Sequence, residues 1–181
     1  MKNSTNTKEY RTLGLLLCFF VFLALLYYFV NLGQLAWDLL LLSAIGWFIL
    51  ESRRDAKRFH NAITIGLFLL VFDFIFENSG WLLGLWHTTS YFHLGVVPIE
   101  VMGIAFFGGT AWATYMPKKF DSRFSFYNCL VFGFFGALGE WLLIHQGLFV
   151  YNPLWTSVDA FFAYFLTWVI LVYLRYRVVR D

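Results

Sequence analysis

In this 181-residue sequence, six carboxylic acids lie inside or close to long apolar stretches. They are the residues of the chain best suited to catalysis or ion binding. They are Asp38, Asp73, Glu77, Glu100, Glu140 and Asp159. A carboxylate in an apolar surrounding without a basic partner binds either a proton or a cation. A neutral carboxylic acid can also donate its proton, so the pattern indicates acid catalysis or ion binding.

The acids differ in how easily a purely structural role explains them. Glu77 and Glu140 are each followed by further apolar residues, so neither can be the start cap of a helix. Asp73 precedes Glu77 by about one helical turn and shares its face. We predict a catalytic group of Asp73, Glu77, Glu100, Glu140 and Asp159. Asp38, Glu100 and Asp159 are near helix starts, and capping is an equally good interpretation of Asp38 and Asp159.

The histidines on the acidic side of the chain are His87, His93 and His145. A single histidine in a loop is more often solvated than a metal ligand. The sequence has no His-Glu-x-x-His spacing, so we predict no metal site. It also has no nucleotide-binding loop, nucleophile elbow or dinucleotide fingerprint, and we predict no cofactor.

The elements that must position these acids are apolar. Apolar residues make up 60% of the chain and charged residues 13%, a balance typical of membrane proteins. About 20 helical residues cross a bilayer core, and continuous apolar runs of this length favour helices over alternating strands. We predict an all-α, polytopic bundle of six transmembrane helices, with glycines in the fourth and fifth serving helix packing. The spans are 13–31, 34–50, 62–85, 94–116, 126–150 and 155–176.

Basic residues fall in four clusters that six spans bring to one side. They are Lys2, Lys8 and Arg11; Arg53, Arg54, Lys57 and Arg58; Lys118, Lys119 and Arg123; and Arg175, Arg177 and Arg180. The positive-inside rule predicts a multi-pass protein of the cell membrane with both termini cytoplasmic. Residues 1–12 form the first cytoplasmic segment, 13–176 the membrane domain and 177–181 the cytoplasmic tail. We expect the basic groups to contact the headgroups of membrane lipids, and we predict no nucleic-acid partner.

An internal repeat surrounds two of the acids. In each copy a glycine follows the glutamate after seven residues and an aromatic residue follows it after nine. The copies are Glu77-Gly84-Trp86 and Glu140-Gly147-Phe149. Each then reaches a second acid, Glu100 or Asp159, so the repeat predicts one central site formed by all four. A weaker third copy begins at Asp38. Tyr151 and Trp155, near span ends, fit an interfacial aromatic belt.

One stretch of the chain resembles a known family. Glu77-Asn-Ser-Gly-Trp-Leu-Leu-Gly-Leu-Trp-His, followed by Gly95-Val-Val-Pro-Ile-Glu100 and Phe106-Phe107, resembles the small membrane carotenoid enzymes. These are the heterodimeric or fused lycopene cyclases and the related carotenoid hydratases. The chain departs from the cyclase pattern in having Val101, and not a second acid, directly after Glu100.

The resemblance implies an isomerase or lyase that protonates a double bond of a hydrophobic, isoprenoid or carotenoid-like substrate. Aromatic faces could stabilise the resulting carbocation. We predict that the substrate contacts Trp81, Trp86, His87, Trp112, Trp141, His145 and Phe149. Two other classes stay open: a small transporter or channel for protons or cations, and a membrane scaffold subunit. A homo- or hetero-oligomer is compatible with each.

Overall fold

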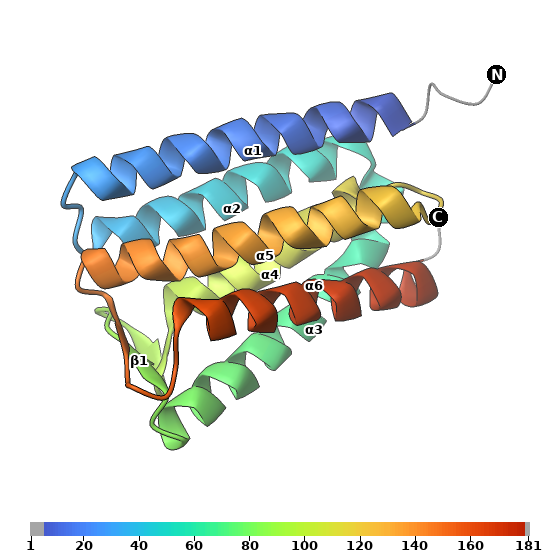
Figure 1. Cartoon of the computed structure of the whole chain (residues 1–181). Helices are drawn as coiled ribbons and strands as arrows, with labels where there is room; N and C mark the ends of the chain where they lie inside the picture. Colours follow the sequence, from blue (N-terminus) through green and yellow to red (C-terminus); the bar gives the residue numbers. More distant parts are fainter. Residues whose placement is uncertain (1–5, 180–181) are drawn as a thin grey trace.

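The computed structural model describes residues 6–179 and consists largely of helices. The helices are α1 (Asn6–Phe29), α2 (Leu35–Arg54), α3 (Ala56–Leu82), α4 (Ile99–Tyr115), α5 (Ser122–His145) and α6 (Ser157–Val178) (Figure 1). Five of them are long and apolar enough to cross a bilayer. α4, with 17 residues, is shorter than a usual span. The all-α prediction is thus confirmed, and the apolar helices indicate a membrane-embedded protein.

The junction of α2 and α3 differs from the loop expected at residues 51–61. α2 continues to Arg54 and α3 begins at Ala56, so Asp55 alone separates them. Asp55 ends one helix and caps the next, since its Oδ1 accepts a hydrogen bond of 3.2 Å from the backbone N–H of Arg58. A carboxylate that satisfies a free N–H of the first turn stabilises a helix start. Because only Asp55 separates the two helices, they include all four basic residues of this cluster: Arg53, Arg54, Lys57 and Arg58.

α4 begins later than predicted, at Ile99, and α5 ends earlier, at His145. The residues next to these two helix ends form two-stranded ribbons instead. β1 (Trp86–Thr88) pairs antiparallel with β4 (Phe149–Tyr151), and β2 (His93–Leu94) with β3 (Val97–Pro98). Gly84 and Gly147 follow the ends of α3 and α5 with φ of 65° and 73°. Glycine adopts this left-handed conformation at little cost, and it ends a helix.

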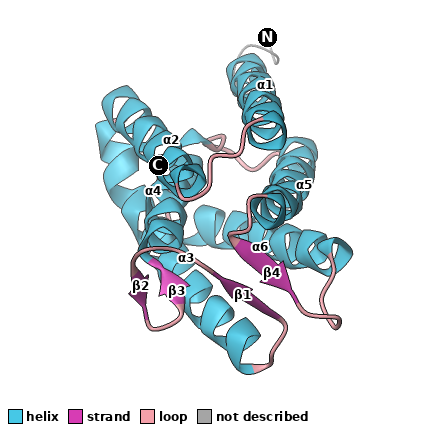
Figure 2. Ribbon diagram, turned by 90° about the vertical axis from the view of Figure 1, so that its left-hand side faces the viewer, coloured by secondary structure: helices cyan, strands magenta, loops and turns pink. Residues whose placement is uncertain are grey.

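The helices form two closely packed groups. α4 packs against α2 and α3, whereas α5 packs against α6 on one side and α1 on another. Figure 2 looks along the bundle and shows α2 and α4 across from α1 and α5. Glycines allow close approach within both groups: a Cβ on Gly66 would lie 2.0 Å from Thr110 Oγ1, and one on Gly136 2.6 Å from Tyr164. β1 and β4 join the two groups at one end of the bundle.

The basic residues that the structure describes gather at the opposite end of the bundle, where α1 begins and α6 ends (Figure 1). We call this the basic end, and the end with β1 and β4 the strand end. Arg58 and Arg175 are buried there and donate hydrogen bonds to the carbonyls of Met116 and Ala113, at the C-terminal end of α4. The C-terminal end of a helix dipole carries partial negative charge and stabilises nearby cations. Lys2 and Arg180 lie outside the described residues.

Candidate functional site

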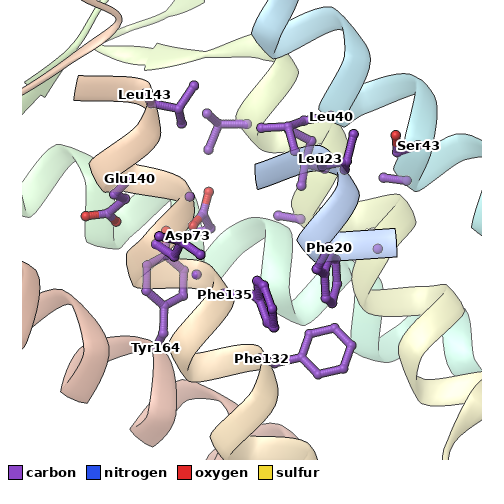
Figure 3. A pocket seen from close by; sticks show the side chains of 18 of the residues that line it. Phe20, Leu23, Leu40, Ser43, Asp73, Phe132, Phe135, Glu140, Leu143 and Tyr164 are labelled. Carbon is purple, nitrogen blue, oxygen red and sulfur yellow. The ribbon is translucent and has the colours of Figure 1, made fainter. Parts of the chain in front are cut away.

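A cavity of about 770 Å³ lies between the two helix groups, and side chains from all six helices line it. Most of the wall is apolar. The ionisable acids in the wall are Asp73 and Glu77 from α3, and Glu140 from α5. Figure 3 shows Glu140, Asp73 and Tyr164 on one side of the cavity, with Leu23, Leu40 and Ser43 on the other. The cavity has the size and apolar lining of a small-molecule site.

Each glutamate has a hydrogen-bond donor in the ribbon at the strand end. Trp86 Nε1 in β1 donates to Glu77 Oε2 at 3.0 Å, and the Tyr151 hydroxyl in β4 donates to Glu140 Oε2 at 2.5 Å. Both glutamates are buried. Tyr164 of α6 also lies near Glu140, on the same side of the cavity (Figure 3). Burial raises the pKa of Tyr151 above its usual value, so its phenol keeps the proton that it donates.

Asp73 is the least satisfied of the three acids. Its Oδ2 atom is buried and has no hydrogen-bond partner. It is an electrostatic neighbour of both Glu77 and Glu140. Among residues 6–179 no basic side chain forms an ion pair with any of the three acids, and the ion pair of Arg54 with Glu51 lies at the basic end. Neighbouring carboxylates without a basic partner resist being ionised together, so such a cluster is suited to holding a proton.

Aromatic rings surround the acids at the strand end of the cavity. The ring of Trp86 lies 4.6 Å from that of Trp155 and 5.1 Å from that of Phe76, measured between centroids. Phe149 is buried and also lines the cavity. Aromatic faces attract cations within about 6 Å. The site therefore combines proton donors with surfaces able to stabilise positive charge on an apolar molecule.

The structure does not bring the other predicted acids into this cavity. Glu100 is buried in a separate polar cluster, where Gln34 Nε2 and Ser90 Oγ each donate to its Oε1 at 3.0 Å. Asp159 is exposed and forms a capping box with Thr156 at the start of α6. Asp38 lies in the first turn of α2. The capping interpretation accounts for Asp159.

The predicted substrate contacts separate in the same way. Trp86 and Phe149 belong to the site. Trp112 is fully buried elsewhere and donates to Asn128 Oδ1 at 2.7 Å. The remaining four have exposed side chains: Trp81, His87, Trp141 and His145. His145 stacks on Tyr28, with ring centroids 5.7 Å apart.

Sequence reasoning missed three members of the site: Tyr151, Tyr164 and Trp155. Tyr151 and Trp155 were assigned to an interfacial belt, but both are half-buried against the acids or the cavity. Tyr151 follows Phe149 by two residues, which puts both side chains on one face of a strand. That spacing was the available signal. Tyr164 lies in an apolar stretch of α6 and gives none.

The acids do not form a ready metal centre. Within the described residues, no group of three or more His, Cys, Asp and Glu side chains is arranged to hold a metal ion. No family model, curated protein or solved structure matches the chain.

Proposed function

We propose that this chain is an intramembrane enzyme that protonates a carbon–carbon double bond of an isoprenoid-like substrate. The observation that carries the proposal is the placement of Asp73, Glu77 and Glu140, without basic partners, in the wall of a large apolar cavity. An acid that stays protonated at neutral pH is suited to this task. The apolar lining favours a hydrophobic substrate.

The proposed reaction needs no redox step. The O–H bond of one glutamic acid breaks, and its proton forms a new C–H bond with the π electrons of the double bond. The neighbouring carbon becomes a carbocation near the rings of Trp155 and Phe76, which lower its energy. A second double bond then attacks it and closes a ring, or water adds to it. The resulting cation, or its adduct with water, then loses a proton to the second glutamate, and transfer of that proton to the first glutamate restores the starting state of both.

Glu140 is the stronger candidate for the proton donor. The phenol of Tyr151 donates a hydrogen bond to it and the phenol of Tyr164 lies nearby, and hydroxyl groups can pass protons along. Glu77 instead accepts from Trp86, whose indole N–H is a donor only. Trp86 therefore positions an accepting oxygen of Glu77 and cannot relay a proton to it. We therefore assign the acid role to Glu140 and the proton-accepting role to Glu77.

For the membrane placement, we propose six spans with the basic end in the cytoplasm. Support comes from the common location of the four basic clusters and from the positive-inside rule. α4 is short for a span, but residues of the β2–β3 ribbon precede it. On this placement the acids lie in the half of the bilayer away from the cytoplasm.

Lipid profiling tests the function. Host cells that make isoprenoids would be compared with and without the full chain, by chromatography and mass spectrometry. We expect a new isoprenoid with either the mass of an existing one or that mass plus one water. Identical profiles in a host shown to contain linear polyenes would contradict the proposal. A proton flux through liposomes that contain the purified protein would instead favour the transporter class.

A further inference from the structure

The exposed residues of the cavity wall all come from α1 and α2. Among the side chains in its wall, four residues are exposed: Phe19 of α1 and Leu42, Gly46 and Leu50 of α2. Leu42 is 62% exposed and Leu50 67% exposed. The wall residues from α3, α4, α5 and α6 are buried or half-buried. The mouth of the cavity therefore lies between α1 and α2.

α1 and α2 are joined at the strand end and diverge from there. Gln146 Nε2 donates to the carbonyl of Val30 at 2.9 Å, and its Oε1 accepts from Leu32 N at 2.6 Å and Gly33 N at 3.1 Å. Beyond this junction α1 packs mainly against α5, and α2 against α4. Two helices that follow one another along the chain are thus held apart along most of their length, and the mouth lies between them.

The dimensions of the cavity suit an extended chain. Its wall includes the stretch of α2 from Leu39 to Leu50 and the stretch of α5 from Phe132 to Leu143. Each of these stretches measures about 17 Å at a helical rise of about 1.5 Å per residue. The acids lie on the far wall, near the strand end, and the mouth lies across from them. An apolar molecule with its reactive end at Glu140 would extend toward α1 and α2.

Three glycines of the wall leave room for such a molecule. Gly46, Gly108 and Gly139 line the cavity, and a Cβ at any of them would have no atom within 4 Å. They therefore serve no close helix contact, contrary to the packing role expected for glycines of the fourth and fifth spans. Glycine inside a helix costs about 1 kcal/mol relative to alanine. Because glycine has no side chain, these three positions leave space in the cavity.

We infer that the substrate enters sideways from the lipid through a portal between α1 and α2, formed by Phe19, Leu42, Gly46 and Leu50. The substrate is an extended apolar chain, and its tail lies in the portal while its reactive end reaches the acids. The portal residues are apolar and exposed where lipid would surround the bundle. The inference rests on the proposed function for the identity of the occupant, but its geometry does not depend on catalysis.

Photolabelling tests the portal without any turnover. The purified full chain in phosphatidylcholine liposomes would be irradiated with a straight-chain hydrocarbon of about sixteen carbons that carries a diazirine, long enough for a cavity of this length. Mass spectrometry would compare labels on the inner wall, such as Leu138 and Ile104, with labels on the exposed Phe134. Gly46→Leu and Leu42→Trp narrow the portal. Gly14→Leu is the matched control, because Gly14 is exposed on α1 and also has open space around it.

In Gly46→Leu we expect inner-wall labelling to fall about tenfold, for which a penalty of about 1.4 kcal/mol is enough. Labelling of Phe134 should stay constant, and Gly14→Leu should behave as wild type. If Gly46→Leu fails to fold, Leu42→Trp narrows the same portal, and the same fall in inner-wall labelling is expected. Unchanged inner-wall labelling in a folded portal variant would overturn the portal, even where Gln variants of the acids lose activity. Suppose instead that labelling is blocked in the portal variants, but that host cells with the wild-type chain have the same lipid profile as cells without it. This result would overturn the proposed function and leave the portal standing.

Discussion

Trp86 and Tyr151 are cross-strand partners in the β1–β4 ribbon, and each donates a hydrogen bond to a different buried glutamate. Trp86 reaches Glu77 of the helix before β1, and Tyr151 reaches Glu140 of the helix before β4. One short ribbon thus orients both acids toward a shared cavity. It also joins the two helix groups that form the cavity walls.

Replacing Tyr151 by Phe should weaken both the fold and the reaction. Phe keeps the ring but removes the hydroxyl that donates to Glu140, and a hydrogen bond to a charged or strongly polar group contributes about 1–3 kcal/mol. We expect a lower free energy of unfolding by about that amount, measured by thermal unfolding in detergent. Tyr173→Phe is the control, because Tyr173 is exposed. Equal stability of the two variants would show that the Tyr151 contact contributes nothing.

Gly147 should resist substitution more than Gly139 does. Gly147 has φ of 73°, where an L-residue other than glycine costs about 1–2 kcal/mol, so Gly147→Ala should lower stability by this amount. Gly139 is inside α5 with open space beside it, so Gly139→Ala should raise stability by up to about 1 kcal/mol. Thermal unfolding of both variants checks the pair. The same sign of change in both would be inconsistent with these backbone conformations.

The sequence predicted the helices and the two central acids better than it predicted the site as a whole. Continuous apolar runs and basic clusters are dense signals, and they located six helices to within several residues. Glu77 and Glu140 stood out because neither could be a cap. The cavity, however, depends on how α1 and α2 diverge, and Tyr164 joins Glu140 from a helix distant in sequence. Glu100 was expected in the same central site, but Gln34 and Ser90 donate hydrogen bonds to it in a separate cluster.

Asp159 should be needed for stability and not for activity. Its carboxylate accepts a hydrogen bond of 2.9 Å from Thr156 N in the capping box, and it is exposed. Asp159→Ala should lower the free energy of unfolding by about 1 kcal/mol, as lost caps do. The amount of new isoprenoid per folded protein should equal that of wild type. A loss of product in a folded Asp159→Ala protein would return this acid to the site.

Reporter fusions should place the two ends of the bundle on opposite sides of the membrane. Fusions after Lys119 and after Asp181 should report cytoplasm, because basic loops are retained there. A fusion at Thr89, at the strand end beside β1, should report the other side. A cytoplasmic Thr89 would refute the six-span arrangement.

The central claim is that Glu77 and Glu140 transfer a proton between the protein and a carbon atom of the substrate, and deuterium incorporation measures this directly. Membranes with wild-type protein, or with Glu77→Gln, Glu140→Gln or the control Asp159→Ala, would be incubated with host isoprenoids in D2O. The amide of Gln preserves size but cannot deliver the proton. We expect a product that carries solvent deuterium on carbon with wild type and with Asp159→Ala. Glu140→Gln and Glu77→Gln, folded and at equal level, should give none. Deuterated product at wild-type yield from the doubly substituted Glu77→Gln, Glu140→Gln protein would contradict the claim.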